Sequence, residues 1–198
     1  MSESRSVLLF DLGGVLIESD MFSQLKRLMK SGRSEAELID MWLDSPIARE
    51  FELGRCPMEE FSQRIVRELQ LSIEPDEFLR AFKTWPKGLY RGADKVLAAL
   101  RRSHTVCCLS NSNEAHWTDA ITGHFDDAFS SHLIGHIKPD RDAFAHVVSE
   151  LGVRPEEVSF FDDAKANVDA AREFGLQAHH TIGYERLKSK LRELGLHE

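Results

Sequence analysis

The sequence lacks an excess of positive charge. Its 198 residues include 25 lysines and arginines against 33 aspartates and glutamates, which gives a formal net charge of -8. Nucleic acids and anionic membranes favour surfaces rich in lysine and arginine, because these side chains neutralise phosphate groups. We therefore expect neither a nucleic acid nor a membrane as the partner, and favour a small molecule.

Cysteine and long apolar runs are also scarce. Cys56, Cys107 and Cys108 are odd in number and match no metal-ligand spacing, which favours a reducing compartment. No apolar run approaches transmembrane length, and Met1 to Ser6 lack the basic start and long apolar stretch of a secretory signal. The expected location is the cytoplasm.

What the sequence does contain is an alternation of strand and helix patterns. Short apolar runs typical of buried strands occur at residues 7–10, 106–109 and 158–161, and helical patterns lie between them, one of them near Glu114 to Thr122. A chain of this length holds one such core. The pattern predicts an α/β fold in which helices wrap a mostly parallel sheet.

A helical block interrupts this alternation. Residues from about Asp20 to Phe82 show helical spacing without a convincing strand, and Ser34 with Glu37 matches the capping box that begins a helix. The stretch from Trp85 to Gly88, rich in turn-forming residues, is expected to be the hinge at which the α/β pattern resumes.

Polar residues follow the predicted strands, at the sheet edge where α/β proteins bind ligands. They are Asp11, Ser110, Asn111, Asp162 and Asp163, and Lys138 is expected in a loop of the same half of the chain. Each alone is explained by a turn, a helix cap or a solvated surface. Together they supply a carboxylate nucleophile, a hydroxyl, a cation and a carboxylate pair, which phosphoryl transfer through an acyl phosphate requires.

Charge explains why all of these groups are needed. The phosphoryl group and the attacking carboxylate are both anions, so Lys138 and a metal held by Asp11 and Asp163 must neutralise their repulsion. Oxygen ligands without a competing cysteine or histidine pattern favour Mg²⁺. The set therefore predicts phosphoryl transfer on Asp11 with Mg²⁺ as the cofactor.

Four segments that carry these residues resemble the four motifs of the haloacid dehalogenase-like hydrolase superfamily. In order along the chain they are FDLGGVL, LSNSN, IKPD and FFDDAKANVDAAREFG. The resemblance covers nearly the whole chain, because the helical block resembles the small cap that the family inserts after its first motif. It implies a Rossmann-like three-layer core at residues 1–19 and 84–198, and a helical cap at residues 20–83.

The resemblance also implies a role for each residue. The catalytic residues would be the nucleophile Asp11 and the bridging cation Lys138, which would bind phosphate together with Ser110, Asn111 and the backbone amides after Asp11. Mg²⁺ would be held by Asp11, the Gly13 carbonyl, Asp163 and Asp162, with Asp163 as a direct ligand and Asp162 supporting the site without touching the ion.

Gly13 departs from the family's usual pattern, in which a second aspartate stands two residues after the nucleophile. That aspartate is the general acid and base of the family's phosphatases, and such a group contributes about 10²- to 10⁴-fold in rate. A slow phosphatase is one consequence. Another is that Glu18, Asp20 or a cap residue replaces the missing carboxyl.

The best subgroup match is to bacterial phosphatases that act on sugar phosphates such as α-glucose-1-phosphate, some of which also carry glycine at this place. We therefore expect a small phosphorylated metabolite, most simply a sugar phosphate, as substrate. In the segment LSNSNEAHW, His116 and Trp117 could both face the substrate. We favour the alternative that His116 lies on a helix surface and that Trp117 is packed against other side chains.

Two other functions stay open at this point. A haloacid dehalogenase needs neither a metal nor an acid for the leaving group and would explain Gly13, although its usual first motif carries tyrosine there. A binding or regulatory protein that has lost turnover would also explain Gly13, but Asp11, Lys138 and Asp163 oppose it. Oligomeric state is not encoded in any recognisable pattern.

Overall fold

The computed structural model describes residues 6–29 and 32–197, so that most of the segment from Met1 to Ser6 lies outside the described residues. Five strands form the main sheet, in the order β5-β4-β1-β6-β7. They are β1 (Val7–Phe10), β4 (Thr105–Ser110), β5 (Asp127–Ser130), β6 (Val158–Asp162) and β7 (Gln177–His180). All neighbouring pairs are parallel. The predicted α/β fold with a mostly parallel sheet is therefore confirmed.

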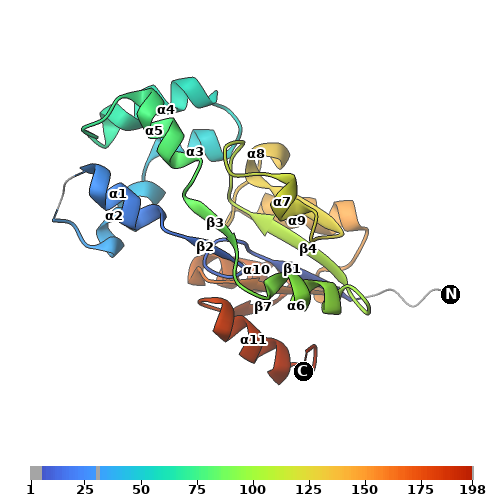
Figure 1. Ribbon diagram of the computed structural model, residues 1–198. Helices are drawn as coiled ribbons and strands as arrows, with labels where there is room; N and C mark the ends of the chain where they lie inside the picture. The colour runs from blue at the N-terminus through green and yellow to red at the C-terminus, as the bar shows by residue number, and fades with distance from the viewer. Residues whose placement is uncertain (1–5, 30–31, 198) are drawn as a thin grey trace.

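Helices cover both faces of this sheet (Figure 1). Helices α6 (Ala93–Leu100) and α11 (Tyr184–Glu193) pack on the face that carries Leu8 and Phe10. Helices α9 (Arg141–Leu151) and α10 (Lys165–Phe174) pack on the face that carries Val7 and Leu9. Since successive strand residues point to opposite faces, burial of both faces explains why the first strand is apolar at every position.

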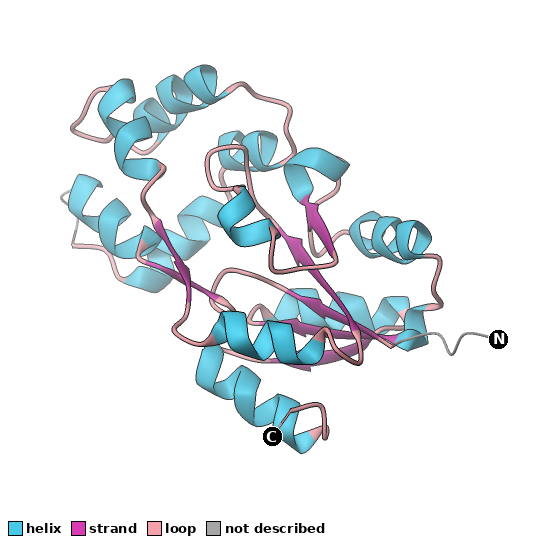
Figure 2. Cartoon of the chain, turned by 45° about the vertical axis from the view of Figure 1, so that its right-hand side comes forward, coloured by secondary structure: helices cyan, strands magenta, loops and turns pink. Residues whose placement is uncertain are grey.

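Five helices between β2 (Ile17–Ser19) and β3 (Pro86–Leu89) form a unit that we call the helical insertion. They are α1 (Met21–Met29), α2 (Glu35–Leu43), α3 (Pro46–Glu52), α4 (Met58–Glu68) and α5 (Pro75–Phe82). They lie beside the sheet in both views (Figure 2). The insertion has an aromatic core of its own, in which the rings of Phe51 and Phe61 stack with centroids 4.0 Å apart.

The beginning of α2 confirms the predicted capping box. Ser34 Oγ accepts a hydrogen bond from the Glu37 amide at 3.3 Å, and the Glu37 carboxylate accepts one from the Ser34 amide at 2.7 Å. These bonds satisfy backbone donors that the first helical turn leaves without partners.

The stretch from Trp85 to Gly88 runs into a strand that the sequence did not predict, because β3 pairs antiparallel with β2 and both connections to the insertion run through this ribbon. The hinge expected there stays a prediction. Another prediction of local structure needs correction. The helix predicted near Glu114 begins only at α7 (Asp119–Thr122). Before it, the Asn113 side chain accepts from the Ala115 amide at 3.1 Å and stabilises a turn instead.

The remaining elements are short. Helix α8 (Ser131–Ile134) follows β5 directly, and a 3₁₀ turn (Pro155–Glu157) precedes β6. Among the described residues, no helix is both long and apolar enough to cross a membrane.

Candidate active site

The carboxyl ends of three adjacent strands bring the predicted residues together. Strand β1 lies between β4 and β6, and Phe10 is in register with Cys108 and Phe161. Asp11 follows β1, while Ser110 and Asp162 end the two neighbouring strands. The Asp11 amide donates to the Phe161 carbonyl at 2.8 Å, which fixes the nucleophile candidate against β6.

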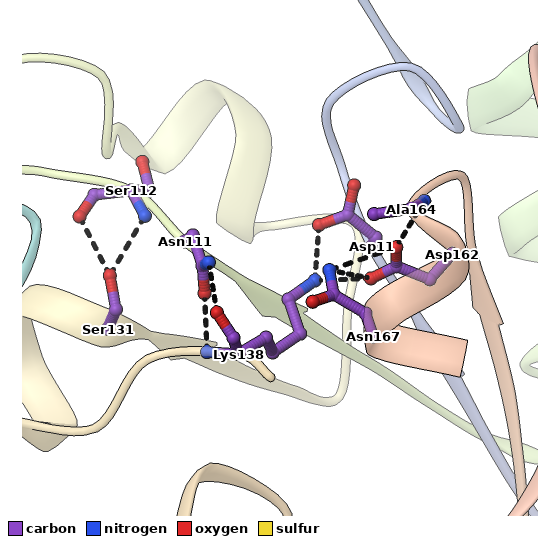
Figure 3. A network of polar contacts seen from close by, with 8 residues as sticks. All are labelled: Asp11, Asn111, Ser112, Ser131, Lys138, Asp162, Ala164 and Asn167. Carbon is purple, nitrogen blue, oxygen red and sulfur yellow. Dashed lines mark hydrogen bonds and ion pairs between the residues drawn. The ribbon is translucent and has the colours of Figure 1, made fainter. Parts of the chain in front are cut away.

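Lys138 joins two of the carboxylates (Figure 3). Its Nζ lies 2.6 Å from Asp11 Oδ1 and 2.7 Å from Asp162 Oδ2, and the residue is 3% exposed. Burial disfavours the ammonium form, but the two carboxylates outweigh burial and raise the pKa of Lys138 above its ordinary value. The lysine is therefore a permanent cation at the bottom of the site.

Asn111 holds the backbone of Lys138 in place. Its Nδ2 donates to the Lys138 carbonyl at 2.9 Å, and its Oδ1 accepts from the Lys138 amide at 2.9 Å (Figure 3). The sequence predicted that Asn111 binds phosphate, and did not predict this bracing contact. The residue also lines the cavity described below, where its backbone and its second Nδ2 hydrogen remain unused by these two bonds.

The two neighbouring aspartates have different surroundings. Asp162 is 0% exposed, and besides Lys138 it accepts from the Ala164 amide at 2.8 Å and from the Asn167 side chain at 3.1 Å. Asp163 is only half-buried and lines the cavity. Asp162 is thus saturated by protein donors, whereas Asp163 faces open space.

Gly14 is required for the position of Asp163. Its φ of +69° lies in the left-handed region, and a Cβ at this residue would lie 2.2 Å from Asp163 Oδ2. Gly13 is different, since a Cβ there would meet no atom within 4 Å. The backbone after Asp11 therefore approaches Asp163 at Gly14 and leaves room for a side chain at Gly13.

The charge of the site fits a divalent cation. Three carboxylates, those of Asp11, Asp162 and Asp163, surround one ammonium group. Burial raises the pKa of Asp11 to about 7 despite Lys138, and burial followed by the charge of Asp162 raises the pKa of Asp163. A cation beside Asp11 and Asp163 would stabilise their ionised forms.

The donor set suits Mg²⁺ in particular. In the described part of the chain, no group of three or more histidine, cysteine, aspartate or glutamate side chains is arranged to hold a metal ion. The available donors are two carboxylates, Asp11 and Asp163, and the exposed backbone of Gly13. Mg²⁺ is commonly bound by one or two carboxylates and keeps several waters, so a small oxygen-only set fits it.

A cavity of about 360 Å³ lies between these residues and the helical insertion. The insertion contributes mainly apolar side chains to its wall, namely Met21, Phe22, Ile39, Trp42, Leu43 and Phe82. It also contributes one acidic residue, Glu52. The cavity thus has a charged floor at the sheet edge and an apolar roof with a single acidic group.

His116 and Trp117 both line this cavity. Trp117 also packs against the core, as we favoured from the sequence, but the favoured surface position of His116 was wrong. His116 lies in the turn before α7, where its Nε2 lies 2.8 Å from the Phe82 carbonyl, to which it donates. Burial lowers the pKa of His116. The histidine is therefore a neutral group that connects the turn to the end of α5.

The carboxylates suggested near the first motif are not at the site. Glu18 is exposed on β2, and Asp20 pairs with Lys87 at 3.0 Å and accepts from Gln24 at 2.9 Å. Neither lines the cavity. Glu52, which does, had not been singled out, because no local pattern distinguishes it from other glutamates of the insertion.

Comparisons with known proteins agree with this geometry. The family model described as haloacid dehalogenase-like hydrolase matches residues 6–175. D-ribitol-5-phosphate phosphatase of Bacteroides thetaiotaomicron is 27% identical over 186 residues, covering 86% of this chain and 88% of the relative. A phosphatase of Mycobacterium tuberculosis is 27% identical over 188 residues, covering 89% of this chain and 87% of the relative.

Solved structures share the fold. A HAD family enzyme of Bacteroides thetaiotaomicron, in complex with magnesium and inorganic phosphate, superposes with a TM-score of 0.72 at 24% identity, covering 90% of this chain and 94% of that one. The match to the family model spans strands β1 to β6, the insertion and all four motifs. The chain therefore belongs to the haloacid dehalogenase-like hydrolase family, as an enzyme whose relatives are phosphatases.

Proposed function

We propose that this enzyme hydrolyses the phosphate ester of a small metabolite, a sugar or sugar-alcohol phosphate, with Mg²⁺ as cofactor and Asp11 as nucleophile. The observation that carries the proposal is the buried contact of Lys138 with Asp11 and Asp162 at the floor of the cavity. The names of the phosphatase relatives support the substrate class, because one of them acts on ribitol-5-phosphate.

In the first half of the reaction, a carboxylate oxygen of Asp11 attacks phosphorus, and the bond from phosphorus to the leaving-group oxygen breaks. Lys138 holds the attacking carboxylate in place and neutralises charge that develops on the phosphoryl oxygens. Ser110 and the amides after Asp11 donate to those oxygens. Mg²⁺, held by Asp11, Asp163 and the Gly13 carbonyl, would supply further charge neutralisation and would orient the phosphoryl group.

In the second half, water attacks the phosphorus of the aspartyl phosphate, which releases inorganic phosphate and restores Asp11. The product dianion forms beside Lys138, whose charge does not change. We assign Asp162 a positioning role, because its contacts with Lys138, Asn167 and the Ala164 amide hold the lysine toward Asp11.

The helical insertion serves as the cap in this proposal, within the range 20–83 expected from the sequence. It covers the floor of the cavity with apolar side chains, which limits the access of water to the charged site. The β2-β3 ribbon carries both connections and is the place where opening and closing would occur.

The direct test is Mg²⁺-dependent release of phosphate from a panel of sugar and sugar-alcohol phosphates by the wild type and by Asp11→Asn. The amide is nearly isosteric but a poor nucleophile, so we expect turnover to fall by about 10⁴-fold or more while the circular dichroism spectrum is unchanged. Retention of more than a few per cent of turnover would remove Asp11 from this role. Halide release without metal would identify a dehalogenase instead, and phosphate binding without turnover would identify a binding protein.

A further inference from the structure

The cavity contains a carboxyl group that the motifs do not explain. Glu52 is the last residue of α3, and with Asp11 and Asp163 it is one of three acidic residues that line the cavity among the described residues. Asp11 and Asp163 belong to the nucleophile and the metal site. Glu52 is thus the carboxyl on the roof, opposite the charged floor.

A chain of hydrogen bonds connects Glu52 to the phosphate-binding side of the core. Ser131 Oγ donates to the Glu52 carbonyl at 2.5 Å and accepts from the Ser112 amide at 3.0 Å. Ser112 lies two residues after Ser110, at the end of β4. The end of α3 is therefore held close to the loop that begins with the phosphate-binding candidates.

The side chain of Glu52 is held in place by a single donor. Trp42 Nε1, from α2, donates to Glu52 Oε1 at 3.0 Å. Neither carboxylate oxygen takes part in a salt bridge among the described residues, although Arg49 is one helical turn away. Arg49 is instead paired with Asp140 at 2.6 Å. Glu52 therefore forms no salt bridge among the described residues, and the charge of Arg49 only partly offsets the effect of burial on its pKa.

We infer that Glu52 is the general acid and base of this enzyme, in place of the aspartate that Gly13 replaces. The inference rests on the proposed phosphatase function and adds the group that handles protons. In an in-line displacement the leaving group points away from Asp11, toward the roof of the cavity where Glu52 lies.

The proton and electron transfers are as follows. When Asp11 attacks, the electron pair of the breaking phosphorus–oxygen bond passes to the leaving-group oxygen, which takes the proton of the Glu52 carboxyl and departs as an alcohol. The Glu52 carboxylate then takes a proton from the water that attacks the aspartyl phosphate. The bond between phosphorus and Asp11 breaks with its electron pair returning to the carboxylate, and Glu52 is protonated again.

The environment of Glu52 suits both roles. Burial raises its pKa to about 7, against smaller opposing effects of the Trp42 hydrogen bond and the charge of Arg49. Two histidines lie on neighbouring elements, His132 of α8 and His116 of the turn before α7, and burial lowers the pKa of both. On α3 itself, Arg49 pairs with Asp140 and Glu50 pairs with Arg64. A carboxyl that titrates near neutral pH can both give and accept a proton during turnover.

His116, the histidine on the cavity wall, is less suited to this work. Its Nε2 hydrogen is engaged by the Phe82 carbonyl at 2.8 Å, and its Nδ1 lies 3.4 Å from the Asn113 amide nitrogen. Both ring nitrogens therefore have protein partners, and neither is available to the leaving group.

The test compares Glu52→Gln with the wild type on two kinds of substrate. Glutamine can still accept from Trp42 but cannot give a proton. A sugar-alcohol phosphate needs protonation of its leaving group, so its kcat/KM should fall by about 10²-fold or more, whereas that of nitrophenyl phosphate should change by less than about 3-fold. Glu50→Gln is the matched control, since Glu50 lies on the same helix and pairs with Arg64 at the surface.

A second arm uses Gly13→Asp, which the open space at that position permits. If the new aspartate supplies the acid, Glu52→Gln should lower kcat/KM for the sugar-alcohol phosphate much less in the Gly13→Asp background than in the wild type. Equal losses of kcat/KM on both substrates, a change in KM alone, or no loss would each overturn the role of Glu52 while leaving the phosphatase proposal intact. Absence of turnover in the wild type would overturn both.

Discussion

The sheet edge and the helical insertion face the same cavity with different chemistry. At the sheet edge, Asp11, Lys138 and Asp162 form a buried network in which each charged group has protein partners. The insertion presents apolar side chains and one carboxyl, Glu52, with one hydrogen-bond donor. Positions at the edge are fixed by many contacts, whereas the insertion leaves its acid free to exchange a proton.

This difference has an energetic basis. A buried ion network is stable only while its partners are present, because an uncompensated charge cannot be solvated there. A single carboxyl in an apolar wall can instead become neutral, and its pKa shifts accordingly. Burial acts in both regions, but at the edge two carboxylates keep Lys138 charged, whereas at the insertion burial favours the neutral form of Glu52.

The comparison is tested most strongly by Lys138→Met. This change leaves Asp11 and Asp162 without their cation, and we expect the free energy of unfolding to fall by about 3–5 kcal/mol, measured by denaturant titration without Mg²⁺. Lys87→Met is the matched control. Lys87 pairs with Asp20 at 3.0 Å on the surface, and its loss should cost less than about 1 kcal/mol. Equal losses would contradict the account of the buried network.

The two aspartates at the end of β6 provide a second test. Asp163→Asn should weaken Mg²⁺ binding by about 10-fold or more, because Asp163 faces the cavity beside Asp11. Asp162→Asn should weaken Mg²⁺ binding less and lower the free energy of unfolding, since Asp162 is a partner of Lys138. Equal Mg²⁺ affinities of the two variants, measured by calorimetry, would show that this division is wrong.

The pH dependence of the free energy of unfolding tests whether Glu52 of the insertion changes its charge near neutral pH. The pKa of Glu52 is about 7 in the folded chain against an ordinary 4.5, so the stability associated with its protonated form is complete below pH 4.5 and is lost as pH rises through 7. The Glu52→Gln variant should not show this loss of stability, because glutamine does not titrate. Between pH 4.5 and 7, the free energy of unfolding of the wild type should fall by about 1–2 kcal/mol relative to that of the variant. This is less than the full pKa shift of Glu52 implies, because the cavity admits water.

Thermal or denaturant unfolding at several pH values measures this difference. Glu50→Gln again serves as the control and should follow the wild type, since Glu50 is half-exposed and paired with Arg64. Parallel pH profiles for the wild type and Glu52→Gln would mean that Glu52 does not titrate near neutral pH.

Much of the sheet edge could be predicted from the sequence. Asp11, Ser110 and Asp162 follow apolar runs directly, and parallel strands bring their carboxyl ends to one edge. The confirmed sheet therefore explains why residues far apart in the chain meet. The roles predicted for Ser110, Lys138 and Asp163 stay predictions, which the substitutions above address.

The rest depended on tertiary contacts that no local pattern records. Glu52 reaches the cavity because Ser131 and Trp42 hold it there. Ser131 is far away in the sequence, and Trp42 lies on the preceding helix α2, so neither contact follows a local spacing pattern. The β2-β3 ribbon is short and contains Pro86 and Gly88, which locally favour a turn over a strand. His116 was placed on a helix because the turn that Asn113 stabilises depends on a side-chain contact rather than on apolar spacing.

The central claim is that the sheet edge supplies a covalent nucleophile and the insertion supplies its proton. The measurement that tests it most directly is the amount of phosphoryl group bound to Asp11 after rapid mixing of Glu52→Gln with nitrophenyl phosphate and Mg²⁺, by acid quench and mass spectrometry of the peptide. This substrate needs little protonation, so Asp11 should be phosphorylated readily, while the missing base should slow hydrolysis. We predict nearly one phosphoryl group per chain on Asp11, far more than in the wild type. Release of phosphate with no phosphoryl group on Asp11 at any quench time would contradict the account.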